Sequence, residues 1–263
     1  MSPSTAAALG GGVVAAAAFA HLVPGVVFLR RARSVVLPGL AGVGRADHVA
    51  LTFDDGPDPA STPAFLDELD RLGITATFFL LGSQVRRCGS LTAEIAGRGH
   101  ELGVHGDTHT NHLVRPAWWV SDDVRRARES IEAASGVAVR WFRPPYGALA
   151  ASSLVAARRS GLRTVLWTTW GRDWRPGIDS DDVVAEVRST MRPGATVLLH
   201  DSDMTSAAGS WKRTLAALGP LAEDWRGAGL VVGPLADHGV ASSPWGGRSR
   251  LADPLACRSN WGE

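Results

Sequence analysis

The clearest indication of the architecture is the segment Val49-Ala50-Leu51-Thr52-Phe53-Asp54-Asp55-Gly56-Pro57. Its first five residues are almost continuously apolar, which is typical of a strand covered on both faces in a parallel sheet. Two aspartates follow the apolar run, and Gly56-Pro57 provides a turn directly after them. The stretch therefore predicts a buried strand that carries acidic side chains at its carboxyl end.

The chain beyond this stretch alternates short apolar runs with helical patterns. The apolar runs are residues 76–81, 102–105, 137–142, 164–167, 196–199 and 230–232. The helical patterns, several of which end at glycine, are residues 61–72, 91–96, 122–135, 150–160, 181–191 and 211–226. Ser121 is a candidate cap for the third of these helices. The alternation predicts an α/β fold, either a (β/α) barrel or a related open sheet.

The size and charge of the chain narrow the class of protein. Its 263 residues suit one domain of the α/β-barrel size with short extensions. A hydrophobic fraction of 45% and a charged fraction of 20% are typical of an ordinary globular core. The net charge of +1 provides no general attraction to nucleic acid or to anionic membranes. We therefore expect no nucleic-acid partner, and the sequence indicates no oligomeric state.

The predicted domain covers residues 47–235, after a leader at 1–46 and before a Gly/Ser/Pro-rich tail at 236–263. Residues 6–29 of the leader contain no Asp, Glu, Lys or Arg and are long enough to span a bilayer. Three arginines follow directly, and the positive-inside rule would then keep the domain in the cytoplasm. Two interpretations stay open: an anchor that places the protein at the cell envelope or membrane, or a helix packed on the domain of a cytoplasmic protein. Because every motif lies further along, we expect a chain that begins near Arg45 to fold.

The two cysteines, Cys88 and Cys257, are too few for a structural zinc site. A disulfide that pins the tail would form only in an oxidising compartment. Both a disulfide and two unpaired thiols are therefore consistent with the sequence.

Acids, histidines and an arginine follow the predicted strands, at the end of an α/β barrel where active sites lie. They are Asp54, Asp55, His105, His109, Arg143, Asp173, His200 and Asp201. His105 and His109 lie four residues apart, so one turn can aim both rings at one point. A carboxylate from a neighbouring strand would complete the three-ligand set of a catalytic zinc site. Each feature alone is weak evidence, because the paired aspartates also suit a simple Gly/Pro turn.

Five motifs occur in order within about residues 47–235. They are Thr52-Phe53-Asp54-Asp55-Gly56-Pro57, His105 to His109, Arg143-Pro144-Pro145-Tyr146-Gly147, Asp173-Trp174 and Leu198-Leu199-His200. This set resembles the polysaccharide deacetylases, also called the NodB-homology domain or carbohydrate esterase family four. The resemblance implies a distorted (β/α) barrel of about seven parallel strands. It also implies metal-dependent hydrolysis of an N-acetyl group, often on N-acetylglucosamine of peptidoglycan or chitin.

The resemblance implies a role for each matching residue. The metal ligands would be Asp55, His105 and His109. The residues of proton transfer would be Asp54 as general base, with Arg143 to orient it, and His200 as general acid, with Asp173 to orient it. The substrate-binding residues would be Tyr146, through its backbone N–H, and Trp174 and Leu198 around the acetyl methyl. The implied cofactor is one divalent ion, with Zn²⁺ expected and Co²⁺ or Mn²⁺ as alternatives.

Two positions depart from the family's pattern. Gly106 stands where the family usually has Ser or Thr after the first metal histidine, a residue that steadies the loop. Trp170 replaces the first Asp of the fourth motif. Neither departure removes a ligand or a catalytic group, but both indicate a substrate groove unlike that of the commonest members.

Four other polar residues are less informative. Asp107 and His112 are expected in a solvated loop, although either could supply an alternative metal ligand. His100 and His238 are expected at the surface.

Rival functions remain at this stage. The spacing of His105 and Asp107 also suits the two-histidine, one-carboxylate triad of an Fe(II) oxygenase, but that triad usually sits on an all-β scaffold. A carbohydrate-binding module with the same fold is a second rival. Binding alone does not need a paired base and acid, and this chain has candidates for both. The same fold could act instead on a small acetylated metabolite or a cyclic amide, which is the strongest alternative.

Overall fold

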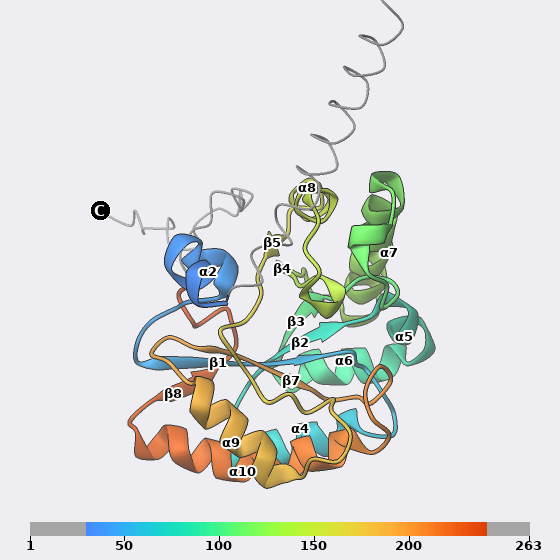
Figure 1. Cartoon of the computed structure of the whole chain (residues 1–263). Coiled ribbons are helices and arrows are strands. Elements are labelled where there is room, and N and C mark those ends of the chain that lie inside the picture. The colour runs from blue at the N-terminus through green and yellow to red at the C-terminus, as the bar shows by residue number, and fades with distance from the viewer. Residues whose placement is uncertain (1–29, 241–263) are drawn as a thin grey trace, which may run out of the picture.

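The computed structural model describes residues 30–240, which form one parallel sheet surrounded by helices (Figure 1). The described strands are β1 (His48–Asp54), β2 (Thr77–Leu80), β3 (Glu101–Val104), β4 (Trp141–Phe142), β5 (Arg163–Thr164), β6 (Thr169–Trp170), β7 (Thr196–His200) and β8 (Val231–Gly233). Their order is β5-β4-β3-β2-β1-β7-β6, with β8 beside the first half of β1. All pairings between them are parallel. The expected α/β class is confirmed.

The sheet curls into an open barrel, which confirms the distorted barrel that the resemblance implied. Within residues 30–240, no strand pairing joins β5 to β6. The prediction of one strand over 164–167 is wrong, because the hydrogen-bond partners of the backbone change within this segment. The N–H of Leu166 donates to the carbonyl of Leu40, and the N–H of Thr168 donates to that of Thr196. The predicted strand 137–142 is likewise shortened to Trp141–Phe142.

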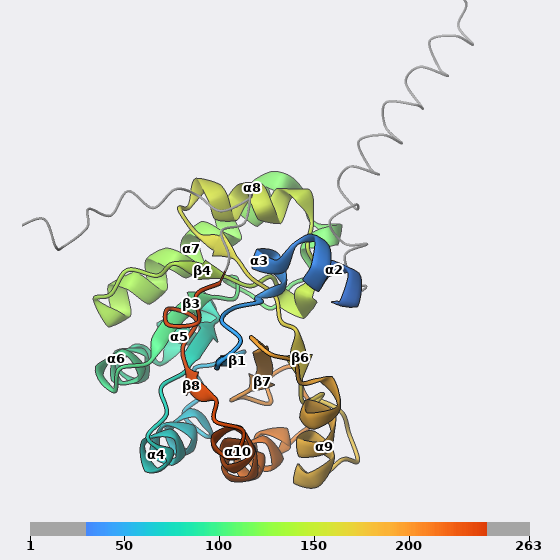
Figure 2. The same cartoon turned by 90° about the vertical axis from the view of Figure 1, so that its left-hand side faces the viewer.

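Helices cover the outside of the curled sheet (Figure 2). They are α4 (Thr62–Leu72), α5 (Gly82–Arg87), α6 (Gly89–Gly97), α7 (Ala117–Ser135), α8 (Ala151–Arg159), α9 (Ser180–Thr190) and α10 (Ser210–Gly227). The predicted cap at Ser121 is wrong, because α7 begins directly after Pro116, whose fixed φ of −68° suits a helix start. Apolar faces of these helices and of the sheet form the main core, with Phe53, Phe65 and Phe78 fully buried at its centre.

Part of the predicted leader packs on the domain. Helices α2 (Arg30–Val36) and α3 (Pro38–Ala41) lie at the seam between β5 and β6. Leu40 is only 2% exposed and packs with Leu149, Leu166, Trp167 and Leu198. Residues 30–41 are therefore part of the folded domain, and the two interpretations of residues 6–29 both stay open. Residues 6–29 lie outside the described residues, and none of the helices between 30 and 240 is long and apolar enough to cross a membrane.

The expected surface positions of His100 and His238 are wrong. His100 is buried, and its Nδ1 accepts the N–H of Ala76 at 3.2 Å. His238 is fully buried with its Nδ1 2.9 Å from Nδ1 of His48. Burial lowers the pKa of both His100 and His238 to about 4. Cys257 lies outside the described residues, so a disulfide with Cys88 and two unpaired thiols both stay open.

We expect the substitution Leu40→Ala to destabilise the protein. Removing a buried leucine side chain typically lowers the free energy of unfolding by about 2–5 kcal/mol. Val36→Ala is the matched control, since Val36 is 73% exposed. Denaturant unfolding of both variants provides the measurement.

The same contacts predict the relative stability of two truncated chains. A chain that begins near Arg45 loses α3 and should be destabilised at least as much as Leu40→Ala. A chain that begins at Arg30 keeps every described contact of α3. Equal stability of the two truncated chains would contradict a structural role for α3.

Candidate active site

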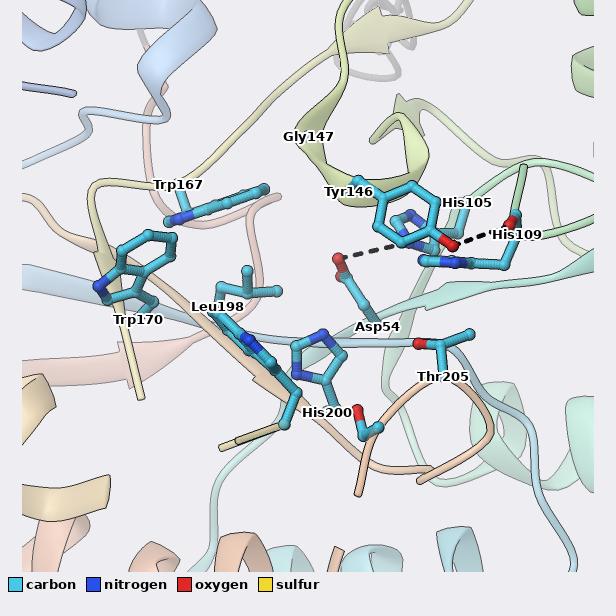
Figure 3. Close-up of a pocket in the computed structure, with 12 residues that line it drawn as sticks. Asp54, His105, His109, Tyr146, Gly147, Trp167, Trp170, Leu198, His200 and Thr205 are labelled. Carbon is cyan, nitrogen blue, oxygen red and sulfur yellow. Dashed lines mark hydrogen bonds and ion pairs between the residues drawn. The ribbon is translucent and has the colours of Figure 1, made fainter. Parts of the chain in front are cut away.

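The predicted site residues meet at the carboxyl edge of the sheet, around a cavity of about 350 Å³ (Figure 3). Its lining residues are Asp54, His105, His109, Tyr146, Gly147, Trp167, Trp170, Trp174, Leu198, His200, Thr205 and Ser206. The remaining predicted residues, Asp55, Arg143 and Asp173, are buried and contact lining residues. Parallel pairing explains the convergence, because Asp54 at the end of β1 lies in register with His200 at the end of β7.

Asp55, His105 and His109 form a cluster with the geometry of a metal site. Oδ1 of Asp55 lies 3.4 Å from Nε2 of His105 and 3.4 Å from Nε2 of His109. The three candidate ligand atoms lie within 4.8 Å of one another. Oδ1 is buried and accepts no hydrogen bond from any described residue, which is costly for a carboxylate oxygen. A divalent cation would satisfy this oxygen, so the residues fit the metal that the resemblance implies.

The two histidines are prepared as ligands by their surroundings. Nδ1 of His105 lies 2.8 Å from the carbonyl oxygen of Arg143. A carbonyl only accepts, so we assign the proton to Nδ1, which leaves the lone pair of Nε2 free. Burial lowers the pKa of His109 to about 4, which also favours the neutral ring. Burial tends to raise the pKa of Asp55, but contact with His105 and the positive charge of His200 outweigh burial and lower the pKa.

Thr205 is a site residue that sequence reasoning missed. Its hydroxyl donates to Oδ2 of Asp55 at 2.5 Å, which leaves Oδ1 facing the histidines. Thr205 belongs to the loop after β7, whose path the sequence does not predict. Trp167, another lining residue, was also not recognised as part of the site.

Asp54 is held by a different partner from Asp55. Nη1 of Arg143 donates to Oδ1 of Asp54 at 2.7 Å, and Oδ2 lies 3.7 Å from Nε2 of His105. The guanidinium of Arg143 is fully buried, stacks 4.1 Å above the ring of Phe79 and also donates to Thr52 at 2.8 Å. Burial lowers the pKa of Arg143, and the charge of Asp54 opposes this shift. The arrangement holds a charged carboxylate in one orientation.

His200, which lies beside Asp54 at the end of β7, is held by Asp173. Nδ1 of His200 lies 2.9 Å from Oδ1 of Asp173, and the backbone N–H of His200 donates to Oδ2 at 2.7 Å. Thr214 donates a further hydrogen bond to Oδ2. Burial tends to lower the pKa of His200, but the charge and hydrogen bond of Asp173 outweigh it and raise the pKa to about 10. His200 is therefore positioned to carry a proton at neutral pH.

Aromatic side chains form the far wall of the cavity. Trp174 lies against His200, with ring centroids 5.5 Å apart. Trp170 contacts Trp174 at 5.4 Å and Trp167 at 6.1 Å. The substitution of Trp for the family's Asp at position 170 therefore adds an apolar surface to the pocket. Tyr146 lies on the opposite side, packed against His109 with ring centroids 4.2 Å apart.

Asp107 and His112 are not in a solvated loop, and neither is an alternative ligand. Asp107 is buried and accepts hydrogen bonds from Arg86 at 2.5 Å and Arg126 at 2.6 Å. His112 is fully buried against Asp123. With Asp107 committed to two arginines, the His105-Asp107 spacing no longer supports an Fe(II) oxygenase.

One aspartate and two histidines that can hold a cation, a second aspartate beside them and a separate histidine–aspartate pair define a metal-dependent hydrolase. Residues 41–165 match the family described as polysaccharide deacetylase. The chain is 35% identical over 199 residues to the chitooligosaccharide deacetylase of Sinorhizobium fredii. The aligned region covers 73% of this chain and 91% of the relative. The chain belongs to the polysaccharide deacetylase family, which confirms the resemblance.

Solved structures share the fold. The Bc1960 peptidoglycan N-acetylglucosamine deacetylase matches with a TM-score of 0.70 and 28% identity, covering 78% of this chain and 94% of that structure. BA3943 from Bacillus anthracis, described as a CE4 family pseudoenzyme, matches with a TM-score of 0.66 and 28% identity, covering 73% of this chain and 65% of that structure. Since a pseudoenzyme shares the fold, activity must be argued from the site residues.

Proposed function

We propose that this protein is a metal-dependent N-deacetylase that hydrolyses the acetamido group of N-acetylated sugars and releases acetate. The observation that carries the proposal is the separation of the two adjacent aspartates. Asp55 faces His105 and His109, whereas Asp54 is held by Arg143. Metal-dependent amide hydrolysis uses both a held cation and a separate base, and a binding module needs neither.

The residues divide the chemistry between them. Asp55, His105 and His109 would hold one divalent ion, which when bound would polarise the amide carbonyl and lower the pKa of a water molecule. Asp54 takes the proton of the attacking water, since Arg143 fixes one of its oxygens and leaves the other for the water. His200, protonated and oriented by Asp173, gives its proton to the leaving amine.

The substrate is held on both sides of the reacting amide. The backbone N–H of Tyr146 would donate to the developing oxyanion. Leu198 and Trp174 would enclose the acetyl methyl, and both line the cavity. The names of the relatives, a chitooligosaccharide deacetylase and a peptidoglycan N-acetylglucosamine deacetylase, support N-acetylglucosamine in a chain as the substrate class.

A small acetylated metabolite or a cyclic amide remains the alternative substrate, because it would use the same residues. Acetate release should therefore be measured on chito-oligosaccharides, peptidoglycan and small N-acetylated amino sugars. We expect release from at least one of the first two substrates, with metal present. Turnover of the small compounds alone would favour the alternative, and no release from any substrate by metal-loaded protein would contradict the proposal.

We expect one metal ion per chain, with Zn²⁺ as the native ion because the ligands are two imidazoles and one carboxylate. Chelation should abolish acetate release, and Zn²⁺ or Co²⁺ should restore it. Elemental analysis of the protein before and after chelation provides the second measurement. Full activity in protein shown to be free of metal would contradict this prediction.

We also propose association with the cell envelope or membrane through the apolar residues 6–29. The full-length chain should sediment with membranes, and a chain that begins at Arg30 should not. Sedimentation of both chains to the same extent would contradict this proposal and favour the cytoplasmic alternative.

A further inference from the structure

The histidines of the metal site lie on one loop, residues 105–109, which follows β3. Both rings must point to Asp55 at the same time for the three side chains to hold one ion. Gly106 within this loop has a φ of +97°, in the left-handed region that favours glycine. The loop therefore depends on contacts from outside itself to keep this conformation.

Gly82 and Ser83 donate to the carbonyls of Gly106 and Asp107, and a buried carboxylate on α7 binds the N–H groups of the loop. Oδ2 of Asp123 accepts the backbone N–H of Asp107 at 3.0 Å, and Oδ1 accepts the backbone N–H of Thr108 at 3.1 Å. The hydroxyl of Thr108 lies 3.3 Å from the same Oδ1. Asp123 is 2% exposed, so these hydrogen bonds are protected from water. Both of its oxygens thus bind the segment between the two metal histidines.

Asp123 is itself held in place by a neighbour. Nε2 of His112 lies 3.3 Å from Oδ2 of Asp123, and Nδ1 of His112 lies 3.1 Å from the hydroxyl of Ser153. A consistent assignment has Nε2–H donating to the carboxylate and the Ser153 hydroxyl donating to Nδ1. Ser153 and His112 are fully buried, so this chain of hydrogen bonds joins the loop to α8 as well as to α7.

The carboxylate of Asp123 also leaves no room for a side chain at residue 106. A Cβ on Gly106 would lie 2.7 Å from Oδ2 of Asp123, closer than the two atoms can approach. The absence of a side chain at this position therefore lets the carboxylate reach the backbone of the loop. Glycine and aspartate here form one matched arrangement.

We propose that Asp123 is a positioning residue that holds the 105–109 loop in its metal-binding conformation before the metal arrives, with His112 holding Asp123. This inference rests on the proposed metal site. Asp123 touches neither substrate nor metal, and it acts through the backbone between His105 and His109.

The test compares two adjacent aspartates on α7. In Asp123→Asn one acceptor oxygen becomes an NH₂ group, which faces a backbone N–H of the loop in either orientation. Loss of a residue that orients metal ligands typically lowers metal affinity by about 10–100-fold. The control is Asp122→Asn, because Asp122 is about half exposed and pairs with Arg125 and Arg126. It should leave the affinity unchanged.

Zinc affinity is measured by competition with a chelator, on the full-length chain. We also expect saturating zinc to restore most of the turnover of Asp123→Asn, which a misfolded protein would not recover. Zinc affinity of Asp123→Asn within twofold of Asp122→Asn would overturn the proposal. If the wild-type chain itself bound no zinc, the proposed function would fail instead, so the two failures are distinguishable.

A second measurement needs no variant, in case Asp123→Asn does not fold. In metal-free wild-type protein, the amide hydrogens of Asp107 and Thr108 should exchange slowly with solvent, because Asp123 already binds them. Adding zinc should change these two rates little. Fast exchange that becomes slow only after zinc is added would mean that the metal orders the loop, and the proposal would be wrong.

Discussion

Asp54→Asn is expected to keep its metal and to lose about 10²–10⁴-fold in turnover, the usual contribution of a general base. The Asn oxygen can still accept the hydrogen bond from Arg143, so the local geometry should be kept. An amide cannot take a proton from water, however. Asp55 should remain intact as a ligand, because its contacts are with Thr205 and the two histidines.

Asp55→Ala is the matched comparison, one residue away. It removes the buried oxygen that faces both histidines, so metal and activity should be lost together. Turnover and metal content measured on both variants separate the two roles. If Asp54→Asn also empties the metal site, the assignment of base and ligand is wrong.

His200→Ala is expected to keep its metal but also to lose about 10²–10⁴-fold in turnover, since the leaving amine would have no proton donor. The sign of the pH effect follows from the protonated form being the active one. Asp173 raises the pKa of His200 to about 10, so activity is present below this pKa and is lost as pH rises through it. Because a bound cation repels the imidazolium, the alkaline limb of the loaded enzyme should lie below this value.

A plot of the wild-type turnover rate against pH should be bell-shaped. The apparent pKa of each limb belongs to a set of coupled groups and not to one residue. His200→Ala should abolish the alkaline limb. Asp173→Asn should move that limb to lower pH, because it removes the charge that raises the pKa of His200. Metal content serves as the control for both variants. Near-normal turnover and the full bell in His200→Ala would show that another group is the acid.

Much of the site could be predicted from the sequence, for a simple geometric reason. Parallel strands carry their carboxyl ends to one edge of the sheet, so polar residues that follow apolar runs must lie near one another. Asp54, His105 and His200 were recognised in this way, and the structure brings all three to the same cavity. Their individual roles stay predictions until the variants above are measured.

The parts that could not be predicted depend on contacts between distant segments. The sequence shows that residues 164–167 are apolar, but not that Leu166 donates to Leu40 instead of continuing a strand. It shows a histidine at 112, but not that Asp123 and Ser153 satisfy both ring nitrogens in the interior. A polar residue can be buried only where partners are supplied, and local patterns do not reveal those partners.

Sequence patterns alone established the α/β class and the edge of the sheet where the site lies. Both depend on periodicity and on residue order, which are local properties of the chain. The family resemblance added a predicted role for each matching residue. The tertiary structure was needed to show that Oδ1 of Asp55 lies close to both histidines, that Thr205 and Asp123 support the site, and that α3 closes the seam of the barrel. These features depend on side chains many residues away and on local backbone direction, such as the φ of +80° at Asp55.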